Sequence, residues 1–141
     1  MAVALLREQF RARDIPAVVI SAGTLEIQGR RAAEFARVAI AELGDEIAAH
    51  IEEHRSQGVS PPLLEMADHI VVMSPRHQDY VRRHAPRANN KVVRLWEFAE
   101  DSSLETIEDP VGLGLVAFRQ CRDLIEQCLQ RWLDDEIQAS D

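Results

Sequence analysis

The stretch "HIVVMSPRHQDYVRRHAP", residues 69–86, predicts a buried strand that leads directly into a helix. Residues 69–74 are a mostly apolar run that ends in Ser74, which is typical of a strand buried on both faces. Pro75 fits the first turn of a helix, where its missing N–H is not needed, and Pro86 follows the end of that helix. A buried strand followed by a helix indicates a parallel sheet that helices cover.

Two more apolar runs are predicted to be strands of the same sheet. One is the Ala-Val-Val-Ile run at residues 17–20, which small residues close, and the other is "KVVRLWEF" at residues 91–98. Buried strands that alternate with helices predict an α/β fold, a three-layer sandwich in which helices flank a small parallel sheet. In sheets of this kind the chemistry lies beyond the carboxyl ends of the strands.

The other helices are predicted from apolar residues that recur at helical spacing. They cover residues 1–13, 29–47 and 115–137, with Gly44 as a helix stop. Residues 48–68 are expected to be irregular, apart from a short helix that Pro61 and Pro62 begin. Residues 101–112 are expected to form a loop. The apolar stripe of the last helix is predicted to contain Val116, Cys121, Leu124, Ile125, Cys128, Leu129 and Trp132.

Length and charge exclude several classes of protein. The 141 residues fit one domain, residues 1–141. A net charge of −8 argues against a nucleic-acid partner and against an anionic membrane surface. No apolar run reaches the roughly 20 residues that span a bilayer, and charges at Arg7 and Glu8 interrupt the N-terminus, which is unlike a signal peptide. We therefore expect a cytoplasmic protein without nucleic-acid or membrane partners, and its oligomeric state stays open.

The two cysteines are predicted to be free and to face the core. Cys121 and Cys128 lie on one predicted helix, about 10 Å apart along its axis, which is too far for a disulfide. Neither lies at a helix N-terminus or in a loop, where a thiol becomes activated. Both are therefore predicted to be small apolar residues of the interior.

A metal site is not expected. His50 and His54 have the i, i+4 spacing of two metal ligands, but the sequence offers no obvious third ligand. The stretch "HIEEH" also differs from the zinc motif H-E-x-x-H in the position of its glutamates. We expect neither a metal nor another cofactor.

Four motifs in order resemble the low-molecular-weight protein-tyrosine phosphatases. They are "SAGT" (21–24), "EHRS" (53–56), "ADHIVVMS" (67–74) and "EDPVG" (108–112). The resemblance covers nearly all of the chain and implies a Rossmann-like α/β fold. It also implies a hydrolase that removes phosphate from phosphorylated protein side chains.

The resemblance also implies that a segment is missing. Members of this family open with a strand and the loop C-x-x-G-N-x-C-R-S-P, which leads directly into a helix. The opening "MAVALLREQF" resembles that helix. We therefore expect an N-terminally truncated chain without the nucleophilic cysteine, the phosphate-binding arginine and the first, central strand. The strands at residues 17–20 and 70–73 would then expose apolar edges, which promotes aggregation.

In this family a thiolate attacks phosphorus, and a carboxylic acid protonates the leaving group. Asp109 matches that general acid, which later acts as the base, and Pro110 restricts its backbone. The alternative is an aspartate that only shapes a turn. Ser21 and His54 match residues that support the phosphate loop, and the alternatives are a polar strand end and an ordinary surface histidine.

The residues expected to line the substrate pocket are aliphatic. The resemblance places Leu25, Pro110 and Val111 at its wall, where tyrosine-specific members carry aromatic residues. In this respect the sequence resembles a bacterial subgroup of the family that includes phosphoarginine phosphatases more than it resembles the tyrosine-specific members. The expected partner is a phosphorylated protein or a small phosphomonoester. A catalytically inactive phosphatase-like binding module remains the alternative, and an arsenate reductase is disfavoured because both cysteines lie mid-helix.

Overall fold

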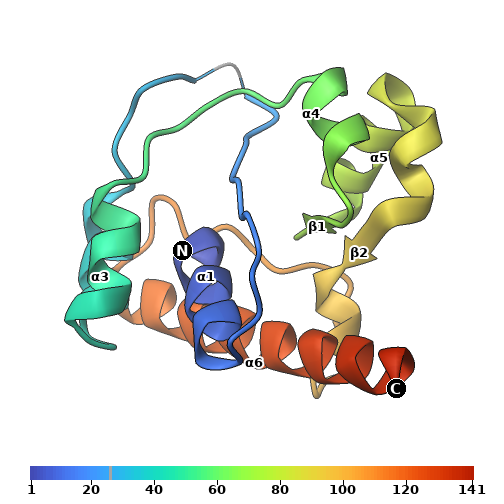
Figure 1. Cartoon of the computed structure of the whole chain (residues 1–141). Coiled ribbons are helices and arrows are strands. Elements are labelled where there is room, and N and C mark those ends of the chain that lie inside the picture. The colour runs from blue at the N-terminus through green and yellow to red at the C-terminus, as the bar shows by residue number, and fades with distance from the viewer. Residues whose placement is uncertain (26) are drawn as a thin grey trace.

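A computed structural model describes residues 1–25 and 27–141 (Figure 1). In chain order, its elements are α1 (Ala2–Ala12), α2 (Glu34–Ala41), α3 (Asp45–Glu52), α4 (Pro61–Met66), β1 (Ile70–Val72), α5 (Pro75–His84), the 3-10 helix η1 (Pro86–Lys91), β2 (Val92–Arg94), the 3-10 helix η2 (Leu95–Phe98) and α6 (Leu115–Ser140).

The sheet of the described residues consists of β1 and β2, which pair in parallel. Ile70 lies opposite Val92, and Val72 lies opposite Arg94. In Figure 1 α5 lies above the two strands and α6 runs below them. This confirms the predicted α/β fold with a small parallel sheet flanked by helices.

The junction between β1 and α5 follows the sequence-based prediction. The Ser74 hydroxyl accepts a hydrogen bond from the His77 N–H at 3.4 Å, so Ser74 caps the helix that Pro75 begins. Arg82, Arg83 and His84 occupy its last turn, where positive charge is favourable to the helix dipole.

The core lies where α6 packs against α1, α2 and η2. Four residues of the predicted stripe of α6 are buried, namely Ile125, Cys128, Leu129 and Trp132. Val116 was predicted to belong to this stripe, and that is wrong, because it is 63% exposed whereas Phe118 is 4% exposed. At about 100° per residue, Val116 lies nearly opposite the face that Phe118 shares with Ile125 and Leu129.

The predicted strand at residues 17–20 is not formed. Val18 is 90% exposed, and the Val19 carbonyl accepts a hydrogen bond from the Arg7 side chain at 2.8 Å. An apolar run becomes a strand only beside a partner, and β1 pairs with β2 instead. The nearest sheet-like pairing is one parallel bridge between Gly23 and Gly58.

Gly44, the predicted helix stop, separates α2 from α3, and its φ of 134° favours glycine. Three other predicted boundaries differ. The predicted helix 29–47 begins only at Glu34. Residues 48–52, predicted to be irregular, continue α3. The predicted strand 91–98 keeps strand geometry only in β2, because Leu95 and Trp96 turn into a 3-10 helix that buries both side chains.

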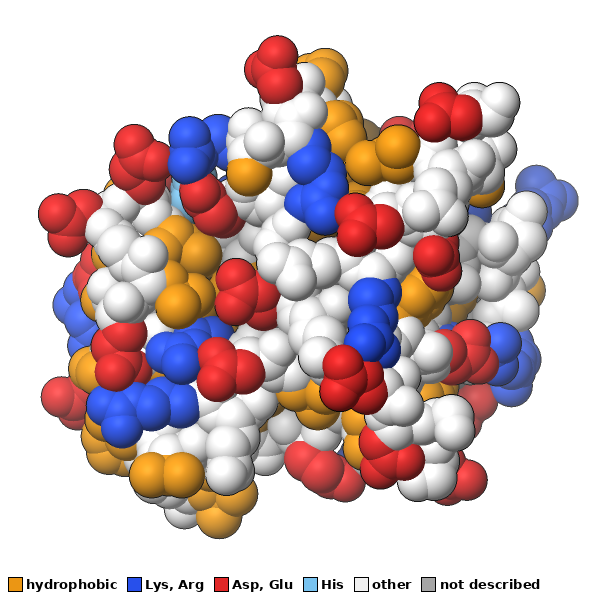
Figure 2. Space-filling model, turned by 90° about the horizontal axis from the view of Figure 1, so that it is seen from below, with side chains coloured by type: hydrophobic (Ala, Val, Ile, Leu, Met, Phe, Trp, Pro, Cys, Tyr) orange, Lys and Arg blue, Asp and Glu red, His pale blue; other side chains and the backbone are white. Residues whose placement is uncertain are grey.

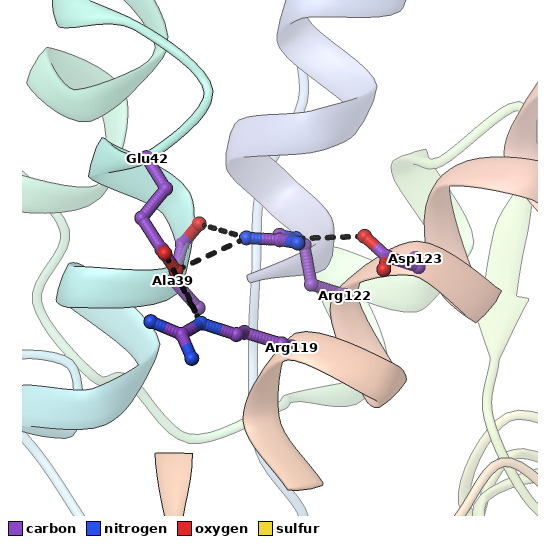
Figure 3. Close-up of polar contacts among 5 residues, drawn as sticks. All are labelled: Ala39, Glu42, Arg119, Arg122 and Asp123. Carbon is purple, nitrogen blue, oxygen red and sulfur yellow. Dashed lines mark hydrogen bonds and ion pairs between the residues drawn. The ribbon is translucent and has the colours of Figure 1, made fainter. Parts of the chain in front are cut away.

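An arginine cluster ties α6 to α2 (Figure 3). The Arg122 guanidinium donates to the Ala39 carbonyl at 2.8 Å and also pairs with Glu42 and Asp123. The Arg119 Nε lies 2.9 and 3.0 Å from the two carboxylate oxygens of Glu42. Figure 2 shows the molecule from below, where acidic side chains are spread over the surface with basic ones among them.

Candidate functional site

Residues 105–112, here called the acid loop, are attached to the carboxyl end of β1. The Ile107 N–H donates to the Met73 carbonyl at 2.8 Å, and the Thr106 hydroxyl donates to the same oxygen at 3.3 Å. Ile107 is buried, which anchors this end of the loop in the core. The loop therefore lies at the edge of the sheet where α/β folds place their chemistry.

Asp109 is exposed, and its carboxylate is held on one side only. Its Oδ1 accepts the Val111 N–H at 3.0 Å, and the buried Pro110 accepts the Leu113 N–H through its carbonyl at 2.9 Å. Oδ2 accepts no hydrogen bond from any described residue. One fixed oxygen and one open oxygen make a group that can exchange a proton with a molecule at the surface.

Asp109 and His54 both interact electrostatically with the N-terminal end of α1. Burial lowers the pKa of the Met1 amino group, while the nearby Cys121 and Asp109 act to raise it. Burial also lowers the pKa of His54, and the positive charges of the Met1 amino group and Arg7 lower it further. The charges of these two predicted site residues are therefore linked through the Met1 amino group.

The structure does not join Ser21 to that group by a hydrogen bond among the described residues. The Ser21 carbonyl accepts the Gln57 side-chain amide at 2.9 Å, and no described residue bonds its hydroxyl. The motif "SAGT" is nevertheless joined to the segment that directly follows "EHRS", because Gly23 donates to the Gln57 carbonyl at 2.8 Å and Val59 donates to the Gly23 carbonyl at 3.0 Å.

The three predicted pocket-wall residues differ in exposure. Leu25 and Val111 are each 69% exposed, whereas Pro110 is buried. Pro110 therefore shapes the acid loop from inside, and the other two present aliphatic surface to the solvent.

His77 is a neighbour of Asp109 that sequence reasoning missed. Its Nδ1 accepts the Met73 N–H at 3.4 Å. Burial lowers the pKa of His77, Arg76 lowers it further, and Asp109 acts to raise it. His77 and Asp109 lie on different elements, so no periodicity or motif connects them in the sequence.

Both cysteines are free, as predicted. The Cys121 thiol donates to the Glu108 carbonyl at 3.6 Å, directly behind the acid loop. Burial raises the pKa of the Cys121 thiol and of the Cys128 thiol. Both therefore stay protonated at neutral pH and are poor nucleophiles.

His50 and His54 do not share a helix, since α3 ends at Glu52. Within residues 1–25 and 27–141, three or more His, Cys, Asp or Glu side chains do not gather in a way that would hold a metal ion. No helix in that part of the chain is both long and apolar enough to cross a membrane.

Residues 1–140 match the family model described as low molecular weight phosphotyrosine protein phosphatase. The chain belongs to this family. Low-molecular-weight phosphatases are phosphoric monoester hydrolases, so the chain belongs to a family of enzymes that remove phosphate groups.

Relatives within the family differ in the substrates that their names state. The chain is 30% identical over 140 residues to a protein-arginine-phosphatase of Geobacillus stearothermophilus, covering 99% of this chain and 87% of that protein. It is 31% identical over 134 residues to a probable low molecular weight protein-tyrosine-phosphatase, EpsP, of Ralstonia nicotianae, covering 94% and 83%. The solved YwlE arginine phosphatase from G. stearothermophilus superposes with a TM-score of 0.79 at 29% identity, covering 99% and 84%.

Proposed function

We propose that this phosphatase hydrolyses phosphorylated protein side chains in two steps, with Asp109 as the proton donor and then the acceptor. In the first step a thiolate attacks phosphorus, the bond from phosphorus to the leaving atom breaks, and Asp109 protonates that atom. In the second step water attacks phosphorus, Asp109 takes the proton of that water, and the thiolate leaves.

The observation that supports this proposal most directly is the half-held carboxylate of Asp109. The Val111 N–H orients Oδ1, and the hydrogen bonds from Ile107 and Thr106 to Met73 set where the loop stands. A general acid must be held in a fixed orientation relative to the leaving group that it protonates, and these hydrogen bonds fix the orientation of Asp109.

The thiolate of this proposal is neither Cys121 nor Cys128, because burial keeps both thiols protonated. The 141 residues also contain no Cys-x5-Arg sequence. We infer that the nucleophile belongs to a loop of that kind outside these residues. Its place would be beside the N-terminal end of α1, close to Asp109 and His54.

Two substrate classes fit the aliphatic pocket wall that Leu25 and Val111 are predicted to form. Leu25 and Val111 offer apolar surface without an aromatic ring, which suits the aliphatic stem of phosphoarginine and still accepts an aryl phosphate. The protein-arginine-phosphatase among the relatives supports the first class. The name of EpsP supports phosphotyrosine.

The test is hydrolysis of p-nitrophenyl phosphate and of an arginine-phosphorylated protein. Two forms are compared: the 141-residue chain, and the same chain with the loop C-x-x-G-N-x-C-R-S-P fused before Met1. In the fused form, Asp109→Asn is expected to lower the rate by roughly 10²–10⁴. The control is Glu108→Gln, the adjacent exposed acid, which is expected to leave the rate unchanged.

The competing function is a phosphate-binding module without turnover. Equal, background-level rates of the fused wild-type protein and its Asp109→Asn variant, together with measurable phosphate binding in a titration, would favour it. A clear rate that depends on Asp109 excludes it.

A further inference from the structure

His77 is the half-buried titratable group that the proposed mechanism leaves unused. It lies in the first turn of α5, where its own N–H donates to the Ser74 hydroxyl at 3.4 Å. Its side chain folds back toward β1, so that Nδ1 accepts the Met73 N–H at 3.4 Å. An acceptor nitrogen carries no proton, so the neutral ring keeps its proton on Nε2.

Met73 is held from both sides. Its N–H is bonded to His77, and its carbonyl accepts hydrogen bonds from Ile107 at 2.8 Å and from Thr106 at 3.3 Å. The first contact comes from α5 and the other two come from the acid loop. The orientation of this one residue therefore couples His77 to the loop that carries Asp109.

We propose that His77 is a positioning residue for Asp109, because the neutral imidazole fixes Met73 and Met73 in turn fixes the acid loop. This inference rests on the proposed role of Asp109. Protonation of Nδ1 would replace the acceptor with a donor, and the Met73 N–H would lose its partner.

Asp109 in turn affects the charge state of His77. Arg76, next in the helix, disfavours a charged imidazole, and the Asp109 carboxylate favours it. Of the elements packed against α5, η1 carries Arg87 and Lys91 and β2 carries Arg94; Lys91 donates to the Glu65 carbonyl and Arg94 pairs with Glu97. The Asp109 carboxylate is the anion that acts to raise the pKa of His77.

The first experiment measures amide hydrogen exchange at Ile107 in the 141-residue chain. His77→Ala removes the acceptor and is expected to speed this exchange about fivefold, the loss that one ordinary hydrogen bond implies. His77→Asn carries Oδ1 near the place of Nδ1 and is expected to restore the wild-type rate. His84→Ala, an exposed histidine of the same helix, is the matched control and should change nothing at Ile107.

Unchanged exchange at Ile107 in His77→Ala would overturn the proposal, and so would an equal acceleration in His77→Asn. The Ala85 amide, which bonds the Val81 carbonyl at 2.8 Å, shows whether α5 itself has opened. If α5 has opened in His77→Ala, the second experiment tests the proposal instead, because it leaves His77 in place.

The second experiment follows the His77 ring by NMR titration in the wild-type chain, in Asp109→Asn and in Glu108→Gln. The Asp109 variant is expected to lower the midpoint of this titration and the Glu108 variant to leave it unchanged. Equal midpoints in all three proteins refute the coupling. Neither experiment measures hydrolysis, so a catalytic role of Asp109 can fail while the link through Met73 stands, and the reverse holds too.

Discussion

The Ile107 N–H donates a hydrogen bond of 2.8 Å to the Met73 carbonyl, and this contact attaches the acid loop to the sheet. Met73 directly follows β1, and Ile107 stands two residues before Asp109. The place of the candidate acid therefore depends on a buried strand rather than on the exposed loop alone.

Thr106→Val is expected to destabilise the fold by about 1 kcal/mol, because the half-buried hydroxyl loses its bond to the Met73 carbonyl. Urea denaturation measures the difference. Ser102→Ala, an exposed change in the loop just before, is the control. Equal denaturation midpoints for the two variants would contradict the assigned bond.

Arg122→Met is expected to cost about 1–3 kcal/mol of stability, because it removes a charged donor from the Ala39 carbonyl and leaves that carbonyl unpaired. Arg122 is 11% exposed and Arg119 is 42% exposed. Arg119→Met should therefore have a smaller effect, and salt should reduce that effect further. Urea midpoints at low and high salt measure both, and a larger loss from Arg119→Met would be inconsistent with the structure.

Stability is expected to fall as the pH drops below about 6.5, the usual pKa of an unfolded histidine. Burial lowers the folded-state pKa of both His54 and His77, so the folded protein favours their neutral forms. That contribution is fully present above the unfolded pKa and is lost as the pH falls through the folded one. Urea midpoints across this range measure the slope, and the double variant His54→Gln/His77→Asn should flatten it. An unchanged slope in the double variant would assign the pH dependence to other groups.

Neither cysteine is expected to react quickly with a thiol reagent in the folded protein at neutral pH. Cys128 is fully buried and Cys121 is half-buried, and burial raises the pKa of both thiols. A colorimetric disulfide reagent measures the rate with and without denaturant, and both thiols should react freely once the chain unfolds. Rapid modification of either thiol in the native state would show an activated cysteine.

The chain is expected to be marginally stable and to self-associate as its concentration rises. Val18 and Ile20 are 90% and 52% exposed, on a segment that pairs with no strand among the described residues. Open backbone beside apolar side chains promotes pairing between molecules. Val18→Ser/Ile20→Ser should reduce association in size-exclusion chromatography with light scattering. Val116→Ser, an exposed valine on α6, should not, since it lies in a helix and not on an open extended segment. A sharp, reversible melt of a monomer at high temperature would count against this expectation.

Local patterns determined much of the fold before any contact was known. Apolar residues at helical spacing predicted α1 and most of α6, and Pro75 marked the first turn of α5. The Asp-Pro pair placed Asp109 in a loop ahead of the last helix. These features depend on residues within a few positions of each other, so the sequence contains all that they need.

Tertiary structure decided the rest, because it depends on partners far away in the chain. The run at residues 17–20 has the composition of a strand, but strand geometry needs hydrogen bonds from a neighbour, and β1 pairs with β2. The link from His77 through Met73 to the acid loop likewise joins two segments that only folding brings together. Side-chain periodicity does not predict such pairings, because it indicates which face of an element is buried but not which element packs against that face.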